Sequence, residues 1–279
     1  MTTDQSPTSL EIESSPSEMV ERRPETTIKP PDRIERSGAS PSHFRRFLRK
    51  LIHRLSYHFV LRRKRTTVVR AAGFRLTVHP TVFHPKYFLT SKFFADFIGH
   101  HDWTGKRVAD VGTGSGILAL AAARAGAAYV LAMDINPSAA AAASENAIAN
   151  GLRSRVGGVC SDLLASIAPR PYFDVILSSP PSFPGQPLDL ADRAWHAGED
   201  YRDIASLFQQ VRDRLAPEGR FYLLLSSDSD VGYFEFLARA AGFCWHLVAK
   251  RSILIESFLI YELQTQEAQK ALCGVQPAQ

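Results

Sequence analysis

The sequence predicts an α/β fold in which a parallel sheet carries helices on both faces. Three observations indicate it. Short apolar runs typical of buried strands alternate with helical stretches over most of the chain. The first core strand leads into a glycine-rich turn at residues 112–116 and then into an alanine-rich helix. Acidic residues, Asp134 and Asp162, follow the next two strands, and open α/β sheets bind ligands at the carboxyl ends of their strands.

Length and composition are consistent with one such domain and further segments at its ends. The chain has 279 residues, of which 45% are hydrophobic, enough for a sizeable core. Three scattered cysteines, Cys160, Cys244 and Cys273, do not make a disulfide framework or a zinc site, so we expect no metal and a cytoplasmic location. No stretch approaches the roughly 18 apolar residues of a membrane span, and the N-terminus lacks the apolar core of a signal peptide.

The first 65 residues divide into a polar tail and a basic segment. Residues 1–42 are rich in Ser, Thr, Pro and Glu, and we expect them to be disordered. Residues 43–65 carry nine Lys and Arg and no Asp or Glu, which accounts for the whole net charge of +5. Apolar residues recur there every three or four positions, as on one face of a helix: Phe44, Leu48, Leu51, Leu55 and Phe59. This basic amphipathic helix could contact nucleic acid or pack on the domain, and an acidic membrane surface is a third alternative.

Residues 66–100 hold a hairpin and a segment that could cover a ligand. The hairpin is favoured by two β-prone runs on either side of a turn that contains Gly73. The apolar segment after it leads into a helix, and Phe88 and Thr90 are candidate residues of a lid, although aromatic residues at this spacing also suit a core. We expect the hairpin strands at 66–70 and 74–78 and the helix at 91–99.

The core domain is expected over 101–263, with a flexible tail at 264–279. Strands that alternate with helices favour parallel pairing through right-handed crossovers. Asn136 and Pro137 suit the cap and first turn of a helix, and Asn150 with Gly151 suits its end. The first expected strand begins at 108, and the next four run over 129–134, 156–160, 174–178 and 220–225. A closing antiparallel pair is expected at 245–251 and 253–263. Two further helices are expected at 201–215 and 231–241.

The spacing of the glycines distinguishes two classes of cofactor. A dinucleotide fingerprint reads Gly-x-Gly-x-x-Gly, whereas this chain has Gly-x-Gly-x-Gly, beginning two residues after Asp110. The pattern resembles motif I of the class I S-adenosylmethionine-dependent methyltransferases. The resemblance implies S-adenosyl-L-methionine as cofactor and a seven-stranded Rossmann-like sheet, here preceded by the small hairpin and the basic helix. The cofactor contacts that it implies are Asp110, Gly112, Thr113, Gly114, Gly116, Asp134 at the ribose, Asp162 at the adenine, Leu163 and Ser179.

A second motif follows the fourth core strand. Residues 178–183, Ser-Ser-Pro-Pro-Ser-Phe, resemble the Asn-Pro-Pro-Tyr/Phe motif of enzymes that methylate exocyclic or amide nitrogens. A conjugated NH2 group attacks poorly until acceptors hold its hydrogens and direct its lone pair at the methyl carbon. The resemblance implies Ser179, Pro180 and Pro181 as catalytic residues that orient the acceptor. Ser182, Phe183 and Trp195 would contact the substrate. Ser179 stands where the family has Asn, so the acceptor geometry differs.

The expected function is methyl transfer to a nitrogen of a protein side chain or a nucleic-acid base, by direct in-line displacement. The resemblance points to the group that contains the release-factor glutamine and ribosomal-RNA guanine-N2 methyltransferases. Two alternatives stay open. One is a non-catalytic adapter that keeps the cofactor fold and binds RNA or a protein partner through the basic helix. The other is a dinucleotide oxidoreductase, against which the glycine spacing argues.

Overall fold

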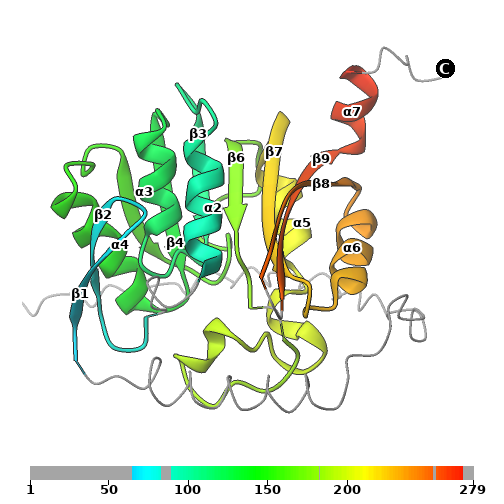
Figure 1. Ribbon diagram of the computed structural model, residues 1–279. Coiled ribbons are helices and arrows are strands. Elements are labelled where there is room, and N and C mark those ends of the chain that lie inside the picture. The colour runs from blue at the N-terminus through cyan, green and yellow to red at the C-terminus, as the bar shows by residue number, and fades with distance from the viewer. Residues whose placement is uncertain (1–64, 83–88, 182, 254–255, 273–279) are drawn as a thin grey trace, which may run out of the picture. The chain divides into compact units, whose positions relative to one another are not determined.

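The part of the chain that the structure describes contains a central seven-stranded sheet and a separate two-stranded hairpin (Figure 1). The computed structural model describes residues 65–82, 89–181, 183–253 and 256–272. The strands of the large sheet lie in the order β5-β4-β3-β6-β7-β9-β8. The predicted tail at 1–42, the basic helix up to residue 64 and the lid candidate Phe88 lie outside the described residues.

Six strands that run in one direction and one reversed strand build the sheet. The strands are β3 (Arg107–Val111), β4 (Tyr129–Asp134), β5 (Val156–Cys160), β6 (Phe173–Ser178), β7 (Leu215–Ser226), β8 (Phe243–Ser252) and β9 (Ser257–Thr265). The last strand in the chain, β9, is inserted between β7 and β8 and pairs antiparallel with both. The predicted α/β class, with its parallel core and reversed closing strand, is therefore confirmed.

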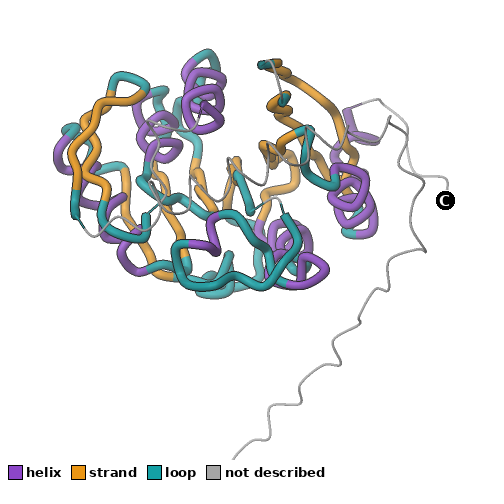
Figure 2. The backbone as a smooth tube through the Cα atoms, turned by 60° about the horizontal axis from the view of Figure 1, so that its bottom comes forward, coloured by secondary structure: helices purple, strands orange, loops and turns teal. Residues whose placement is uncertain are grey.

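Helices cover both faces of the sheet (Figure 2). On one face lie α2 (Leu89–Gly99), α3 (Ile117–Arg124) and α4 (Pro137–Ala149), and on the other lie α5 (Leu207–Arg214) and α6 (Val231–Ala240). The alternation of strand side chains produces this division, because Tyr222 and Leu224 of β7 join the first core, whereas Phe221, Leu223 and Leu225 join the second. Each face is thus sealed by its own apolar cluster.

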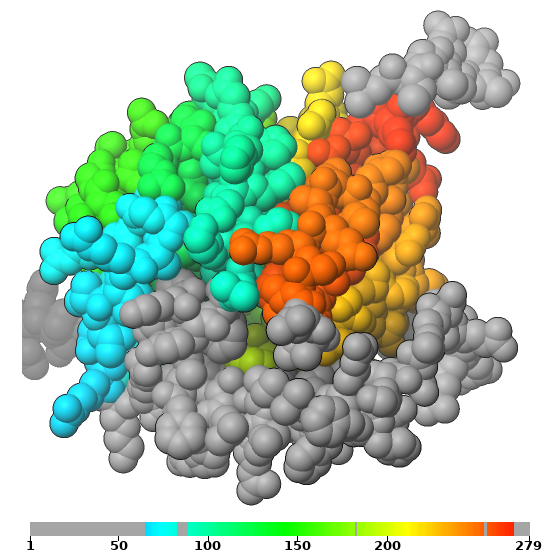
Figure 3. Space-filling model, in the orientation of Figure 1, coloured from blue at the N-terminus to red at the C-terminus, as the bar shows by residue number. Residues whose placement is uncertain are grey.

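The hairpin packs on the first face. Its strands are β1 (Thr67–Ala71) and β2 (Phe74–Val78), joined by Ala72 and Gly73, both with positive φ, as the tightest hairpin turns require. The buried side chains of β2 enter the same apolar cluster as α3 and α4. Figure 3 shows the hairpin, in cyan, against the green atoms of these helices. The guanidinium of Arg124 lies 3.8 Å from the ring centre of Phe74 and donates to the Ala72 carbonyl.

The predicted helix at 201–215 differs from the observed structure. A 3-10 segment, η3 (Glu199–Ile204), comes first, and the α-helix begins only at Leu207. Asp200 and Tyr201 have φ of 50° and 61°, which an α-helix cannot contain. Strand β7 also begins at Leu215, five residues before the predicted start. Its pairing with β6 is interrupted after the first residue pair, and the Pro-Glu-Gly sequence at 217–219 falls within this irregularity.

The end of the core domain also differs from expectation. The closing strands begin at Phe243 and Ser257 in place of 245 and 253, and β9 runs to Thr265 and is followed by α7 (Gln266–Leu272) where a flexible tail is expected. The Gln266 amide donates to the Gly242 carbonyl, and Glu267 pairs with Arg212 at 2.8 Å, which accounts for the extra helical turn.

Between β5 and β6 the chain forms only turns. Their backbone is held by side chains of α5: Gln210 accepts from the Leu164 amide, and Arg214 donates to the Ile167 carbonyl.

Candidate functional site

The glycine-rich loop, residues 112–116, joins β3 to α3. All three of its glycines have positive φ, between 54° and 82°, which is why residues without a side chain occupy these positions. A Cβ on Gly116 would lie 2.9 Å from the Cα of Ala143 in α4, whereas a Cβ on Gly112 would meet nothing within 4 Å. The loop therefore rests on α4 at Gly116 and presents open backbone at Gly112, where a ligand can approach closely.

Asp110 is fully buried beneath this loop. Its Oδ2 accepts hydrogen bonds from the Thr113 hydroxyl, at 2.6 Å, and from the Ala119 amide, at 3.1 Å. Its Oδ1 is buried and has no hydrogen-bond partner. Burial, opposed by those two hydrogen bonds, raises the pKa of Asp110 to about 7. A buried carboxylate oxygen without a partner is rare, and a ligand that carries an N–H donor into the loop would satisfy it.

Asp134, at the end of β4, connects the glycine-rich loop to α4. One carboxylate oxygen accepts from the Gly114 amide and the other from the Asn136 amide, both at 2.9 Å. Burial raises the pKa of this carboxyl group as well. Each oxygen retains a second lone pair, so the group can accept hydrogen bonds from two hydroxyls of a ribose. The residue between, Ile135, exposes 37% of its surface, an apolar contact surface that sequence reasoning missed.

Asn136 joins the chain beyond the hairpin to the same corner. Its side chain caps α4 by accepting from the Ser138 amide, as the sequence predicts. Its amide nitrogen also donates to the carbonyl and the hydroxyl oxygen of Thr81. The residues next expected to cover the site, 83–88, lie outside the described residues, and Thr90 is half-buried in the first turn of α2.

The end of β5 lies beside Asp134. Cys160 is the register partner of Asp134, and the Ser161 amide donates to the Asp134 carbonyl at 2.9 Å. The next residue, Asp162, is exposed, and Leu163 has a φ of 49°, an uncommon conformation for a branched side chain. The predicted adenine-binding pair, Asp162 and Leu163, thus begins one residue after Ser161, whose amide contacts the predicted ribose-binding residue Asp134.

The Pro-Pro turn lies on the other side of the glycine-rich loop. Val111, the last residue of β3, pairs with Met133 of β4 and with Ser178 of β6, and the Ser178 hydroxyl donates to the Val111 carbonyl at 2.9 Å. Beyond it Ser179 is exposed, Pro180 is buried and Pro181 is half-buried, whereas Ser182 lies outside the described residues. The predicted cofactor and acceptor residues therefore meet at one edge of the sheet.

The connection after the turn folds back on itself at the carboxyl ends of β6 and β7, in yellow-green in Figure 1. Phe183 exchanges backbone hydrogen bonds with Trp195 and Ala197. The rings of Phe183 and Trp195 are stacked, 6.5 Å apart and inclined by 22°. These two predicted substrate-contacting residues thus form one aromatic pair.

Asp192, which sequence reasoning missed, holds this connection together. Only 4% of it is exposed. Its carboxylate accepts from the Leu188 amide at 2.9 Å and lies 3.1 Å from Nδ1 of His196. An acidic residue in a polar loop gives no local sign of such burial. This contact ties His196 to the same buried carboxylate.

The described residues also delimit other kinds of site. Within those ranges no group of three or more His, Cys, Asp or Glu side chains is arranged to hold a metal ion. No helix in that part of the chain has the length and apolar character needed to cross a bilayer.

Comparison with known proteins gives consistent results. The family described as ribosomal protein L11 methyltransferase (PrmA) matches residues 90–179. The ribosomal protein L11 methyltransferase of Deinococcus radiodurans is 32% identical over 202 residues, covering 66% of this chain and 67% of that protein. A putative protein N5-glutamine methyltransferase of Methanocaldococcus jannaschii is 31% identical over 167 residues, covering 57% and 80%. Among solved structures, the 16S rRNA N2 G methyltransferase RsmC of T. thermophilus, in complex with AdoMet and guanosine, superposes with a TM-score of 0.54 at 22% identity, covering 72% of this chain and 50% of that one, and so shares the fold.

Proposed function

We propose, on the premise that this chain belongs to the class I S-adenosylmethionine-dependent methyltransferases, that it methylates a nitrogen of a protein side chain or a nucleic-acid base. Two observations support a nitrogen acceptor. The Ser-Ser-Pro-Pro turn ends the strand next to the glycine-rich loop, in the place of the related Asn-Pro-Pro motif. Two of the similar proteins are named for a glutamine N5 and an RNA N2 acceptor.

The residues present fit S-adenosylmethionine. In our assignment Gly112, Thr113, Gly114 and Gly116 approach its methionine end with their backbone, and the unpartnered Oδ1 of Asp110 receives a donor there. The two oxygens of Asp134 accept from the ribose hydroxyls. The exposed carboxylate of Asp162 accepts from the adenine amino group, and Leu163 packs beside the base. The orphaned oxygen of Asp110 is the single observation that carries this assignment, because the folded chain itself leaves it unsatisfied.

The acceptor nitrogen is oriented by the Pro-Pro turn. S-adenosylmethionine, when bound, supplies an electrophilic methyl carbon attached to a positively charged sulfur. The Ser179 hydroxyl and the Pro180 carbonyl accept hydrogen bonds from the two hydrogens of the acceptor NH2, which directs the lone pair at that carbon. The nitrogen lone pair forms the new N–C bond, the electrons of the broken C–S bond remain on sulfur, and the nitrogen then loses a proton to water. Phe183 and Trp195 provide the surface on which a flat acceptor group stacks, and Ser182 is kept as a proposed contact of the same group from its place in the motif.

The test is methyl transfer from radiolabelled S-adenosylmethionine by the purified full chain, with lysate fractionated into protein, RNA and small molecules. We expect label in the protein or RNA fraction. Ser179→Ala should lower the turnover of the labelled acceptor about tenfold, as loss of one hydrogen bond implies. The matched control is Ser154→Ala, which changes an exposed serine just before β5, at the amino ends of the parallel strands and away from the Pro-Pro turn. Label confined to small molecules, or equal turnover by the two variants, would contradict the proposal.

We further propose that residues 43–65 contact RNA phosphates and that the protein acts in the cytoplasm. Charge and the low cysteine content alone support this, since most of this segment lies outside the described residues. Replacing Arg62, Arg63, Lys64 and Arg65 by Gln should lower affinity for total RNA and flatten its salt dependence. An unchanged salt slope argues against RNA contact and favours packing of the segment on the domain.

The division of the chain into functional segments is also our proposal. Residues 101–263 form the transfer domain, and the hairpin within 66–100 completes it by packing on α3 and α4. The expected tail at 1–42 and the segment 264–279, which holds the end of β9 and α7, are not assigned to the reaction. A chain truncated before residue 66 that retains S-adenosylmethionine binding would support this division, whereas one that loses binding would contradict it.

A further inference from the structure

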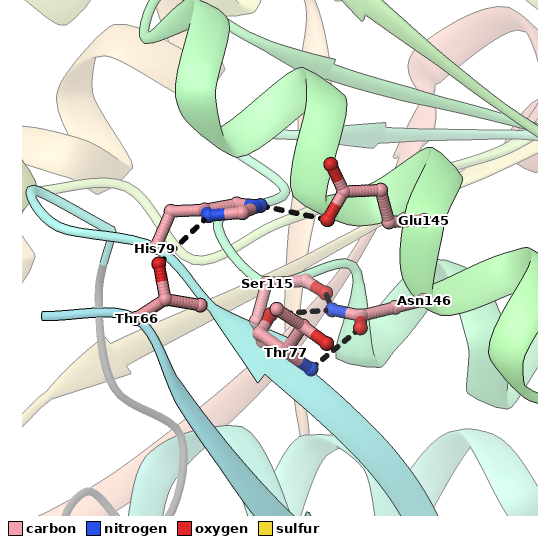
Figure 4. Close-up of polar contacts among 6 residues, drawn as sticks. All are labelled: Thr66, Thr77, His79, Ser115, Glu145 and Asn146. Carbon is pink, nitrogen blue, oxygen red and sulfur yellow. Dashed lines mark hydrogen bonds and ion pairs between the residues drawn. The ribbon is translucent and has the colours of Figure 1, made fainter.

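The hairpin is joined to α4 by a seam of side chains (Figure 4). β1 pairs with one edge of β2, and the outward backbone groups of β2 are bonded by Asn146 of α4 and by Asn150, which caps the end of that helix. Asn150 accepts from the Arg75 amide and donates to its carbonyl, at 3.0 and 2.8 Å. Asn146 does the same for Thr77, at 2.6 and 2.9 Å. The two asparagines, one helical turn apart, thus replace a missing neighbouring strand.

A third contact lies at the end of the seam. Nε2 of His79 is 2.7 Å from a carboxylate oxygen of Glu145, and Nδ1 of His79 is 3.3 Å from the Thr66 hydroxyl. The side chains of His79 and Glu145 are partly exposed, and these two side-chain hydrogen bonds join only the hairpin segment and α4. They hold the hairpin without reaching the glycine-rich loop.

Asn146 differs from its neighbours because it also reaches the glycine-rich loop. It is fully buried, and its amide nitrogen donates to the Ser115 carbonyl at 2.9 Å as well as to Thr77. The amide on the other side of that peptide unit, from Gly116, donates to the Thr113 carbonyl at 2.9 Å. Both polar ends of the Ser115–Gly116 peptide are therefore fixed, one of them by Asn146.

We propose that Asn146 is a positioning residue for cofactor binding, which orients the Ser115–Gly116 peptide and couples the shape of the glycine-rich loop to the docking of the hairpin. The inference rests on the proposed role of this loop. A loop with three glycines has many accessible conformations, and a ligand that must select one of them binds more weakly. Asn146 removes this cost in advance, since its three hydrogen bonds are formed in the free protein.

The chain offers matched controls for this role. Asn150→Ala removes the same kind of paired hydrogen bonds from the same edge of β2, and Glu145→Gln weakens the His79 contact. Neither change touches the glycine-rich loop. A difference between Asn146→Ala and these two variants therefore measures loop positioning, separately from hairpin docking.

The experiment compares the four full-length proteins by calorimetric titration with S-adenosylmethionine and by hydrogen exchange without ligand. Asn146→Ala should raise the Kd about tenfold, as loss of a buried hydrogen bond implies, and should speed exchange in the 112–119 peptide as well as at Thr77. Asn150→Ala should speed exchange at Arg75 and, like Glu145→Gln, leave the Kd within about twofold. Folded Asn146→Ala protein with a Kd equal to that of Asn150→Ala would overturn the inference.

A second measurement covers the case in which Asn146→Ala does not fold. Because coupling between two sites is reciprocal, saturating S-adenosylmethionine should slow exchange of the Thr77 amide in the unaltered protein more than that of Arg75. Equal exchange at Thr77 with and without S-adenosylmethionine would overturn the inference while leaving the cofactor site intact. Failure of the unaltered protein to bind S-adenosylmethionine would overturn the proposed function, and this inference with it.

Discussion

Alanine substitutions at Gly105, Gly112 and Gly116 distinguish two constraints on the glycine-rich loop: the left-handed backbone and the space available to a Cβ. Gly105, Gly112 and Gly116 have φ of 75°, 77° and 82°, so alanine at each costs about 1–2 kcal/mol for the left-handed backbone alone. At Gly105 and Gly112 the new Cβ meets nothing within 4 Å, whereas at Gly116 it lies 2.9 Å from the Ala143 Cα. Overpacking of that kind adds about 1–3 kcal/mol. Gly116→Ala should therefore cost about 2–5 kcal/mol in total.

The assay is urea unfolding of each variant together with calorimetric titration of S-adenosylmethionine. We expect Gly112→Ala and Gly105→Ala to lose similar amounts of unfolding free energy and Gly116→Ala to lose more. Only the two loop variants should bind S-adenosylmethionine more weakly, Gly112→Ala by at least about tenfold, because its methyl group fills the space through which the ligand meets the backbone. If Gly112→Ala binds as tightly as Gly105→Ala, the ligand does not approach the loop at Gly112 and the reasoning is refuted.

Three further predictions concern buried carboxylates. Asp134→Ala should raise the Kd of S-adenosylmethionine more than tenfold in the same titration, since hydrogen bonds to charged groups contribute about 1.5–3 kcal/mol; a Kd within twofold would remove the ribose assignment. Burial raises the pKa of Asp110 from 3.8 to about 7, so its stabilising contribution is complete below pH 3.8 and is lost as the pH rises through about 7, on the order of 4 kcal/mol in all. The free energy of unfolding, measured at several pH values, should fall over this range in the unaltered protein and should not show this fall in Asp110→Asn. An identical pH dependence in the two proteins would contradict the raised pKa. Asp192→Ala should lower kcat/KM for the labelled acceptor while the Kd of S-adenosylmethionine stays unchanged, because it loosens only the connection at 183–198; a change in the Kd alone would place that connection at the cofactor instead.

Local sequence patterns predicted the parts of the site that depend on local conformation. The spacing of Gly112, Gly114 and Gly116 indicates three residues that need positive φ, and all three have it. Asn136 followed by Pro137 indicates a helix start, and the observed cap is there. Such signals are readable because the residue type and the backbone conformation that it favours occupy the same position.

The contacts that join distant segments could not be predicted in this way. Asn146 lies in an alanine-rich helix, and its partners Thr77 and Ser115 are 69 and 31 residues away. Tyr201 has a φ of 61°, and its ring packs against Tyr233 and Phe234; tertiary contacts of this kind commonly override the helical pattern of a segment. No local sequence pattern marks such residues, since the constraint comes from a partner far along the chain.

The helix-free connection between β5 and β6 has a consequence for engineering the cofactor specificity of this protein. Asp162 and Leu163 begin that connection, and α5 holds its backbone through Gln210 and Arg214. We therefore expect substitutions on α5 to change the position of the proposed base-binding residues, although α5 does not carry any of them. A mutant library intended to accept cofactor analogues with an altered nucleobase should randomise Gln210 and Arg214 along with the residues that touch the base.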